Sequence, residues 1–165
     1  MVKKWGFVGA GGKLFRGFSP INLDEKGRLA VPTRYRAELK ESCEHQFVLT
    51  VSPHRCLWLY PLPEWEDIER KISKLPSFDK KAQRLQRLLI GHATDCEMDG
   101  QGRVLIAEPL RKFAGLEKRV VLVGLGKKFE IWDEDVWNRS RDEWLEEENL
   151  DDLSTLSTEL GNISL

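Results

Sequence analysis

Apolar residues fall into short β-prone runs in some parts of the chain and into a helical period in others. The short runs predict two β-hairpins. The first is formed by residues 47–51 and 56–60, and the second by residues 120–123 and 129–132. Antiparallel hairpins of this kind, combined with separate helices, predict a mixed α+β chain.

Three longer segments predict helices. Four apolar residues between Trp65 and Leu75 recur at helical spacing, which predicts an amphipathic helix that ends at Pro76. Asp79 is predicted to cap a second helix. A third helix is expected from about Glu134, and Trp137 on it is expected to face the core, as are Trp58, Trp65 and Trp132 elsewhere in the chain.

The chain contains an internal repeat. Residues 24–31 and 99–106 both read Asp-x-x-Gly-Arg followed by an apolar run, 75 residues apart. With a two-residue insertion, residues 32–39 align with 109–116, and the proline that begins each segment is predicted to open a short helix. The pairs Leu59-Tyr60 and Ile131-Trp132 also match, because each ends in an aromatic residue that is followed five residues later by a tryptophan. The fold predicted is therefore two tandem pseudo-repeats of a β-layer with flanking helices.

The repeat divides the chain into five parts. They are a flexible leader (1–13), the first repeat (14–61), connecting helices (62–94), the second repeat with a C-terminal helix (95–145) and an acidic tail (146–165).

No apolar run approaches the roughly 20 residues needed to span a bilayer, so we expect no membrane partner. Three cysteines are an odd number for a disulfide framework, which favours the reducing cytoplasm.

The formal net charge of −1 hides a segregation of charge. Residues 141–165 hold one Arg and eight acidic residues, whereas residues 1–40 hold nine Lys or Arg and three acidic residues. A basic amino-terminal part is compatible with phosphate binding, so nucleic acid stays a candidate partner.

The two Asp-x-x-Gly-Arg turns carry the clearest candidate chemistry. Arg donates two parallel hydrogen bonds to guanine O6 and N7, and cations neutralise phosphates. The candidate DNA-contacting side chains are Lys26, Arg28, Gln101 and Arg103. Asp24 and Asp99, four residues before each Arg, are expected to hold the guanidinium in one rotamer. A buried Asp–Arg pair that only staples the hairpin is the alternative, and spacing alone favours neither.

A second function class rests on carboxylates. If residues 95–99 form a strand, Asp95, Glu97 and Asp99 share one face, as in a divalent-metal phosphodiesterase. The favoured interpretation is that these carboxylates form a solvated outer face, with Cys96 and Met98 packed inward. The first repeat has no matching carboxylate cluster. No catalytic triad is recognisable. We therefore expect a non-enzyme without a metal, a cofactor or a small-molecule substrate.

The chain resembles the MraZ family of bacterial transcriptional regulators, in the AbrB/SpoVT-like swapped-hairpin superfamily. The resemblance covers residues 14–145, most of the chain. The matching segments are Phe15–Gly17, Asp24–Pro32, Cys56–Pro61 with Trp65, Asp99–Arg103, Val121–Gly124 and Phe129–Trp132. The family has Met where this chain has Leu14, so residues 1–13 are alternatively a start-site extension.

The resemblance implies a fold in which the two repeats complete each other's β-layer and protomers assemble into a ring homo-oligomer. It also implies a nucleoid-associated DNA-binding protein, generally a repressor, that binds short G-rich tandem direct repeats near the promoter of the division and cell-wall gene cluster. Carried over to this sequence, Arg28 and Arg103 contact bases or phosphates with Lys26 and Gln101 beside them. Asp24 and Asp99 orient the two arginines.

Overall fold

The computed structural model describes residues 14–147; the predicted leader and most of the predicted acidic tail lie outside this range. The strands are β1 (Phe15–Asn22), β2 (Arg28–Ala30), β3 (Gln46–Val51), β4 (Leu57–Pro61), β5 (Thr94–Glu97), β6 (Arg103–Leu105), β7 (Arg119–Gly126) and β8 (Phe129–Asp133). The helices are α2 (Thr33–Cys43), α3 (Leu62–Ser73), α4 (Lys80–Leu89), α5 (Glu108–Ala114) and α6 (Glu134–Glu147).

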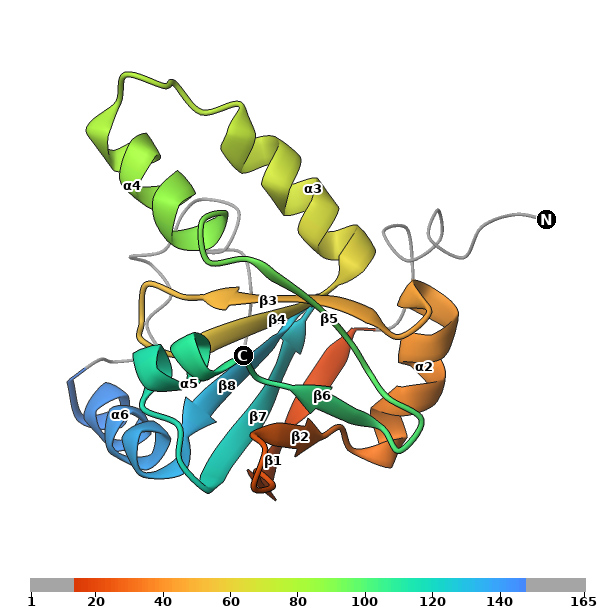
Figure 1. Ribbon diagram of the computed structural model, residues 1–165. Helices are drawn as coiled ribbons and strands as arrows, with labels where there is room; N and C mark the ends of the chain where they lie inside the picture. The colour runs from red at the N-terminus through yellow and green to blue at the C-terminus, as the bar shows by residue number, and fades with distance from the viewer. Residues whose placement is uncertain (1–13, 148–165) are drawn as a thin grey trace, which may run out of the picture. The chain divides into compact units, whose positions relative to one another are not determined.

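A six-stranded antiparallel sheet has the order β1-β7-β8-β4-β3-β5 (Figure 1). The hairpins β3–β4 and β7–β8 form as predicted and join through β4 and β8 at the centre of the sheet. Each outer strand pairs with the hairpin of the other repeat: β1 with β7, and β5 with β3. The repeats therefore complete each other's β-layer, which confirms the predicted fold class.

A second, two-stranded sheet joins the two copies of the repeated motif. β2 and β6 are antiparallel, and Leu29 lies opposite Val104. Both side chains are almost completely buried, at 0% and 1% exposure. Two further main-chain hydrogen bonds extend the pairing, from Val31 N to the Gly102 carbonyl (2.8 Å) and from Ile106 N to that of Gly27 (3.0 Å). This short ladder brings the two turns together.

The two faces of the large sheet support separate hydrophobic clusters. On one face, the rings of Phe15, Tyr35 and Phe129 pack together, with centroids 4.6–5.9 Å apart, beneath β2, β6 and α5. On the other face, α3 and α4 pack Trp65, Ile72 and Leu89 against the sheet. Alternate residues of β3 point to the two clusters, as the period of a strand requires.

The connecting helices form largely as the sequence predicts. α3 begins at Leu62, earlier than the first apolar residue of the predicted stripe, and ends at Ser73, before Pro76. The Asp79 carboxylate accepts hydrogen bonds from the main-chain nitrogens of Lys81 (2.8 Å) and Ala82 (3.2 Å), so the predicted cap of α4 is confirmed.

The two-residue insertion in the repeat alignment is wrong. The residue before α2 is Pro32 (φ −54°, ψ 140°), and the residue before α5 is Ala107 in the same conformation (φ −57°, ψ 142°). The 75-residue spacing therefore continues into the helices, and Pro109 has no counterpart in Pro32. Proline suits the extended position before a helix and also the first helical turn, where a missing N–H costs nothing. Prolines at both sites misled the alignment.

The chain divides into two compact units after Glu134. The second unit contains α6, in which the rings of Trp137 and Trp144 meet edge to face with centroids 5.8 Å apart. Trp137 is half-buried and its Nε1 atom is buried, so its core-facing position stays a prediction. In the part of the chain that the structure describes, no helix has the length and apolar character needed to cross a membrane.

Candidate nucleic-acid interface

The two Asp-x-x-Gly-Arg turns lie beside each other because β2 and β6 pair. In this antiparallel register, Arg28 lies opposite Leu105 and Arg103 lies opposite Ala30. The two copies of the motif, 75 residues apart in the sequence, thereby lie side by side, as β2 and β6 do in Figure 1. The register relates them by approximate two-fold symmetry about the Leu29–Val104 pair.

In the first turn, Asp24 organises both the main chain and the arginine. Its Oδ1 accepts hydrogen bonds from the main-chain nitrogens of Lys26 and Arg28, each at 2.9 Å. Its Oδ2 accepts one from Arg28 Nε at 2.6 Å. Asp24 thus binds Arg28 through Nε. Within residues 14–147, the terminal nitrogens of Arg28 make no hydrogen bond.

The second turn repeats this arrangement. Asp99 Oδ1 accepts hydrogen bonds from the main-chain nitrogens of Gln101 and Arg103, each at 2.9 Å, and Oδ2 accepts one from Arg103 Nε at 3.0 Å. Arg103 Nη1 also lies 3.9 Å from Asp24 Oδ2, so the two turns interact electrostatically. The two arginines are 28–29% exposed and the two aspartates 33–38%, so neither pair is a buried staple.

Two arginines beneath the turns were not among the predicted site residues. Arg111 Nη1, from α5, donates hydrogen bonds to the carbonyls of Lys26 (3.0 Å) and Ile106 (3.1 Å). Arg36 Nε, from α2, donates to the Val31 carbonyl (2.8 Å) and lies against Gly102. Each repeat therefore supports the turn of the other. The constant 75-residue spacing would have matched Arg36 with Arg111, and the inserted gap concealed this.

The glycine of each turn is needed for conformation and for space. Gly27 has φ +83° and Gly102 has φ +77°, in the left-handed region that side chains disfavour. A Cβ on Gly27 would lie 1.5 Å from Arg111 Nη1, and one on Gly102 would lie 2.3 Å from Arg36 Cζ. Each glycine therefore leaves room for the arginine of the other repeat.

We expect Gly27→Ala to lower the free energy of unfolding by about 3–4 kcal/mol. The positive φ costs about 1–2 kcal/mol, and displacing Arg111 removes hydrogen bonds worth about 1 kcal/mol each. Gly100→Ala is the control, since nothing lies within 4 Å of its added Cβ and the first repeat already has Glu25 there. Urea unfolding of both variants checks this, and equal stabilities would contradict it.

Hydrogen bonding lowers the pKa of both aspartates. The main-chain N–H of Arg28 contributes most to lowering the pKa of Asp24 from its usual 3.8 to about 2. The main-chain N–H of Arg103 likewise contributes most to lowering the pKa of Asp99. A lowered pKa means that the carboxylates stabilise the turns fully above about pH 4. This contribution is lost as the pH falls through the native pKa.

We therefore expect a carbon-13 NMR titration of the Asp24 carboxyl group to have its midpoint near pH 2. Arg28→Ala removes the side-chain hydrogen bond and the charge of Arg28 but keeps its main-chain N–H, so the pKa of Asp24 should rise in that variant and yet stay below its usual value. A midpoint near 3.8 in the wild-type protein would show that the turn does not hold the carboxylate as described.

The carboxylates of the phosphodiesterase alternative do not form a metal site. Asp95 and Glu97 lie on exposed positions of β5, while Asp99 lies in the turn and is engaged by Arg103. Met98 is buried and Cys96 half-buried, as the solvated-face interpretation predicts. Within residues 14–147, no group of three or more His, Cys, Asp or Glu side chains is arranged to hold a metal ion.

Comparison with known proteins agrees with the doubled architecture. The family model described as "MraZ protein, putative antitoxin-like" matches residues 14–88 and again residues 89–158. A transcriptional regulator MraZ of Methylococcus capsulatus is 62% identical over 151 residues, which cover 92% of this chain and 99% of that protein. A protein of the same name from Thioalkalivibrio sulfidiphilus is 56% identical over 152 residues, covering 92% of this chain and all of that protein. The chain belongs to the MraZ family.

Proposed function

We propose that this chain is a sequence-specific DNA-binding transcriptional regulator whose paired Asp-x-x-Gly-Arg turns read the DNA. The observation that carries the proposal is the β2–β6 pairing, which places Arg28 and Arg103 in one half-exposed surface. The relatives named transcriptional regulator support the class of function.

The geometry of the turns suits base recognition. Asp24 and Asp99 each fix an arginine at Nε, which leaves the terminal nitrogens for an acceptor pair such as guanine O6 and N7. Fixing the rotamer in advance reduces the conformational entropy that binding costs. In this proposal Lys26 and Gln101, exposed beside the arginines, contact phosphate or neighbouring bases.

We further propose that the DNA consists of short G-rich tandem direct repeats near the promoter of the division and cell-wall gene cluster, and that binding represses it in the nucleoid. Tandem boxes suit a ring of protomers, because each bound turn raises the effective concentration of the next. Boxes about one helical turn apart would keep successive protomers on one face of the duplex.

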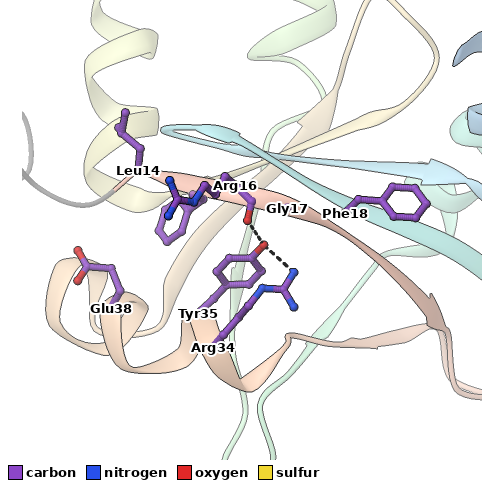
Figure 2. Close-up of a pocket in the computed structure, with 8 residues that line it drawn as sticks. Leu14, Arg16, Gly17, Phe18, Arg34, Tyr35 and Glu38 are labelled. Atoms are coloured by element: carbon purple, nitrogen blue, oxygen red, sulfur yellow. Dashed lines mark hydrogen bonds between the residues drawn. The ribbon is translucent and has the colours of Figure 1, made fainter.

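A groove beside the edge strand β1 supports self-association. It has a volume of about 670 Å³ and is lined by Leu14, Phe18, Arg34, Tyr35 and Glu38, among others. Figure 2 shows the Tyr35 hydroxyl directed at the Arg16 carbonyl, with Arg34 beside it. Leu14 is 62% exposed and β1 is an edge strand of the large sheet, two features that support contact with a second copy.

Fluorescence anisotropy of the protein on a duplex of tandem G-rich boxes, and on a scrambled duplex, tests the proposed function. We expect tighter binding to the boxes and a steep loss of affinity with salt. Equal affinity for both duplexes would overturn the proposal. Added Mg²⁺ or Mn²⁺ tests the enzymatic alternative, because a phosphodiesterase would cleave the duplex and a regulator would leave it intact.

A further inference from the structure

The α3–α4 hairpin presents a strongly basic outer surface. Residues 70–87 contain seven Lys or Arg and one acidic residue. All seven basic side chains are exposed: Arg70, Lys71, Lys74, Lys80, Lys81, Arg84 and Arg87. Lys80, Arg84 and Arg87 are spaced so that they share one face of α4.

Within residues 14–147, most of this charge has no carboxylate partner. Arg70 and Lys71 pair with Asp67, at 3.4 and 3.1 Å. For the other five cations, no carboxylate among residues 14–147 lies within 4.0 Å. Asp79, the acidic residue within the segment, has its carboxylate engaged in capping α4. Among the described residues, the outer face of the hairpin therefore carries positive charge that few carboxylates offset, and such a face suits a polyanion.

The packing of the hairpin favours a phosphate backbone over a membrane. A helix that lies in a lipid interface buries a free apolar face. Most of the apolar side of α4 is already occupied, because Leu85 and Leu89 pack in the cluster with Trp65, and Leu88 alone of the α4 leucines is exposed, at 38%. Phe78, which is 88% exposed, lies in the loop between the helices and does not make an apolar face.

We propose that the outer face of the α3–α4 hairpin is a second, sequence-independent DNA contact that binds backbone phosphates. The inference rests on the proposed function and extends it to DNA outside the boxes. The hairpin packs on the face of the large sheet opposite to the cluster that contains Leu29 of β2 (Figure 1). The DNA that it contacts is therefore a flanking segment or a second duplex.

The test compares a neutral hairpin with a charge-preserving one. Lys80→Gln/Lys81→Gln/Arg84→Gln/Arg87→Gln removes four positive charges and keeps good helix formers. Lys80→Arg/Lys81→Arg/Arg84→Lys/Arg87→Lys is the matched control. Fluorescence anisotropy across a salt series gives the affinity of each variant for two duplexes. One contains the G-rich boxes alone, and the other contains the boxes with long flanks of random sequence.

We expect the neutral variant to bind the flanked duplex about tenfold to a hundredfold more weakly, with the salt slope lower by about 0.9 for each phosphate that is no longer neutralised. Its preference for boxes over scrambled sequence and the binding of the control variant should stay unchanged. Unchanged affinity and salt slope on the flanked duplex would overturn the inference. So would a loss confined to binding of phosphatidylglycerol vesicles, which would identify a lipid surface instead.

The same data separate this inference from the proposed function. If the wild-type protein prefers the boxes and the neutral variant behaves identically on flanked DNA, only the hairpin contact fails. If the wild-type protein shows no preference but the neutral variant loses salt-dependent binding, the proposed sequence reading fails and the hairpin contact stands.

Discussion

Replacing Arg28 and Arg103 together with alanine is expected to remove the preference for G-rich boxes. A bidentate hydrogen-bond pair between arginine and guanine discriminates against the wrong base by about 1–3 kcal/mol, which is about 5- to 150-fold in affinity for each arginine. Both arginines lie in the paired turns with Nε held by an aspartate, so each substitution removes a preorganised donor. Anisotropy on boxed and scrambled duplexes measures the change.

The control for charge removes two exposed cations from the neighbouring helices. Lys40→Ala/Lys112→Ala lowers the net charge equally but leaves both turns intact. We expect this variant to keep the preference and to lose only part of its salt-dependent affinity. If both double variants lose the preference alike, or if the Arg28→Ala/Arg103→Ala protein keeps it while folded, the turns are not the reading elements.

Leu29→Ala is expected to lower the free energy of unfolding by about 2–5 kcal/mol. Leu29 is completely buried at the centre of the β2–β6 ladder, opposite Val104. Truncating it leaves a cavity where the two repeats meet, in a cluster that also contains residues of α2 and α5. The substitution should therefore destabilise the two turns together.

Leu105→Ala is the matched control in the same ladder. Leu105 is 53% exposed and lies opposite Arg28, so its truncation should change stability by no more than about 0.5 kcal/mol. Urea unfolding followed by far-ultraviolet circular dichroism compares the two variants. Equal effects would show that the β2–β6 ladder is not part of the cooperative core.

Local sequence patterns correctly predicted the elements that depend on neighbouring residues alone, namely the hairpins, the start of α4 and the two turns. The β-branched and aromatic runs predicted β3–β4 and β7–β8, and the capping residue Asp79 marked the start of α4. The repeated Asp-x-x-Gly-Arg motif located both turns, because glycine at positive φ and an aspartate that bonds two residues ahead are local features. The resemblance, rather than the pattern, supplied the exchange of strands between repeats.

Features that depend on distant residues were not predictable in the same way. The pairing of β1 with β7 is set by burial across the whole sheet, and neither strand identifies its partner. The arginines beneath the turns, Arg36 and Arg111, were missed because prolines at two different helix positions displaced the alignment. For Trp137 the helical period predicts a core-facing position, and the side chain is half-buried with its ring against that of Trp144.

The positive charge of the α3–α4 hairpin is visible in the sequence only when residues 70–87 are counted separately from the acidic residues before them. Residues 70–87 are basic, yet acidic residues in the first half of α3 reduce the net charge of the connecting segment. Only the folded hairpin shows that the cations of α4 lie on the face that α3 and the sheet leave exposed.

The most direct test of the paired turns as base readers removes one acceptor atom from the DNA. Boxes containing 7-deazaguanine lack the N7 acceptor, and their affinity is compared for the wild-type protein and for Arg28→Ala. We expect the modified boxes to weaken wild-type binding markedly and to weaken the variant much less, a coupling that reports a direct contact. Equal losses of affinity for both proteins would contradict base reading by the turns.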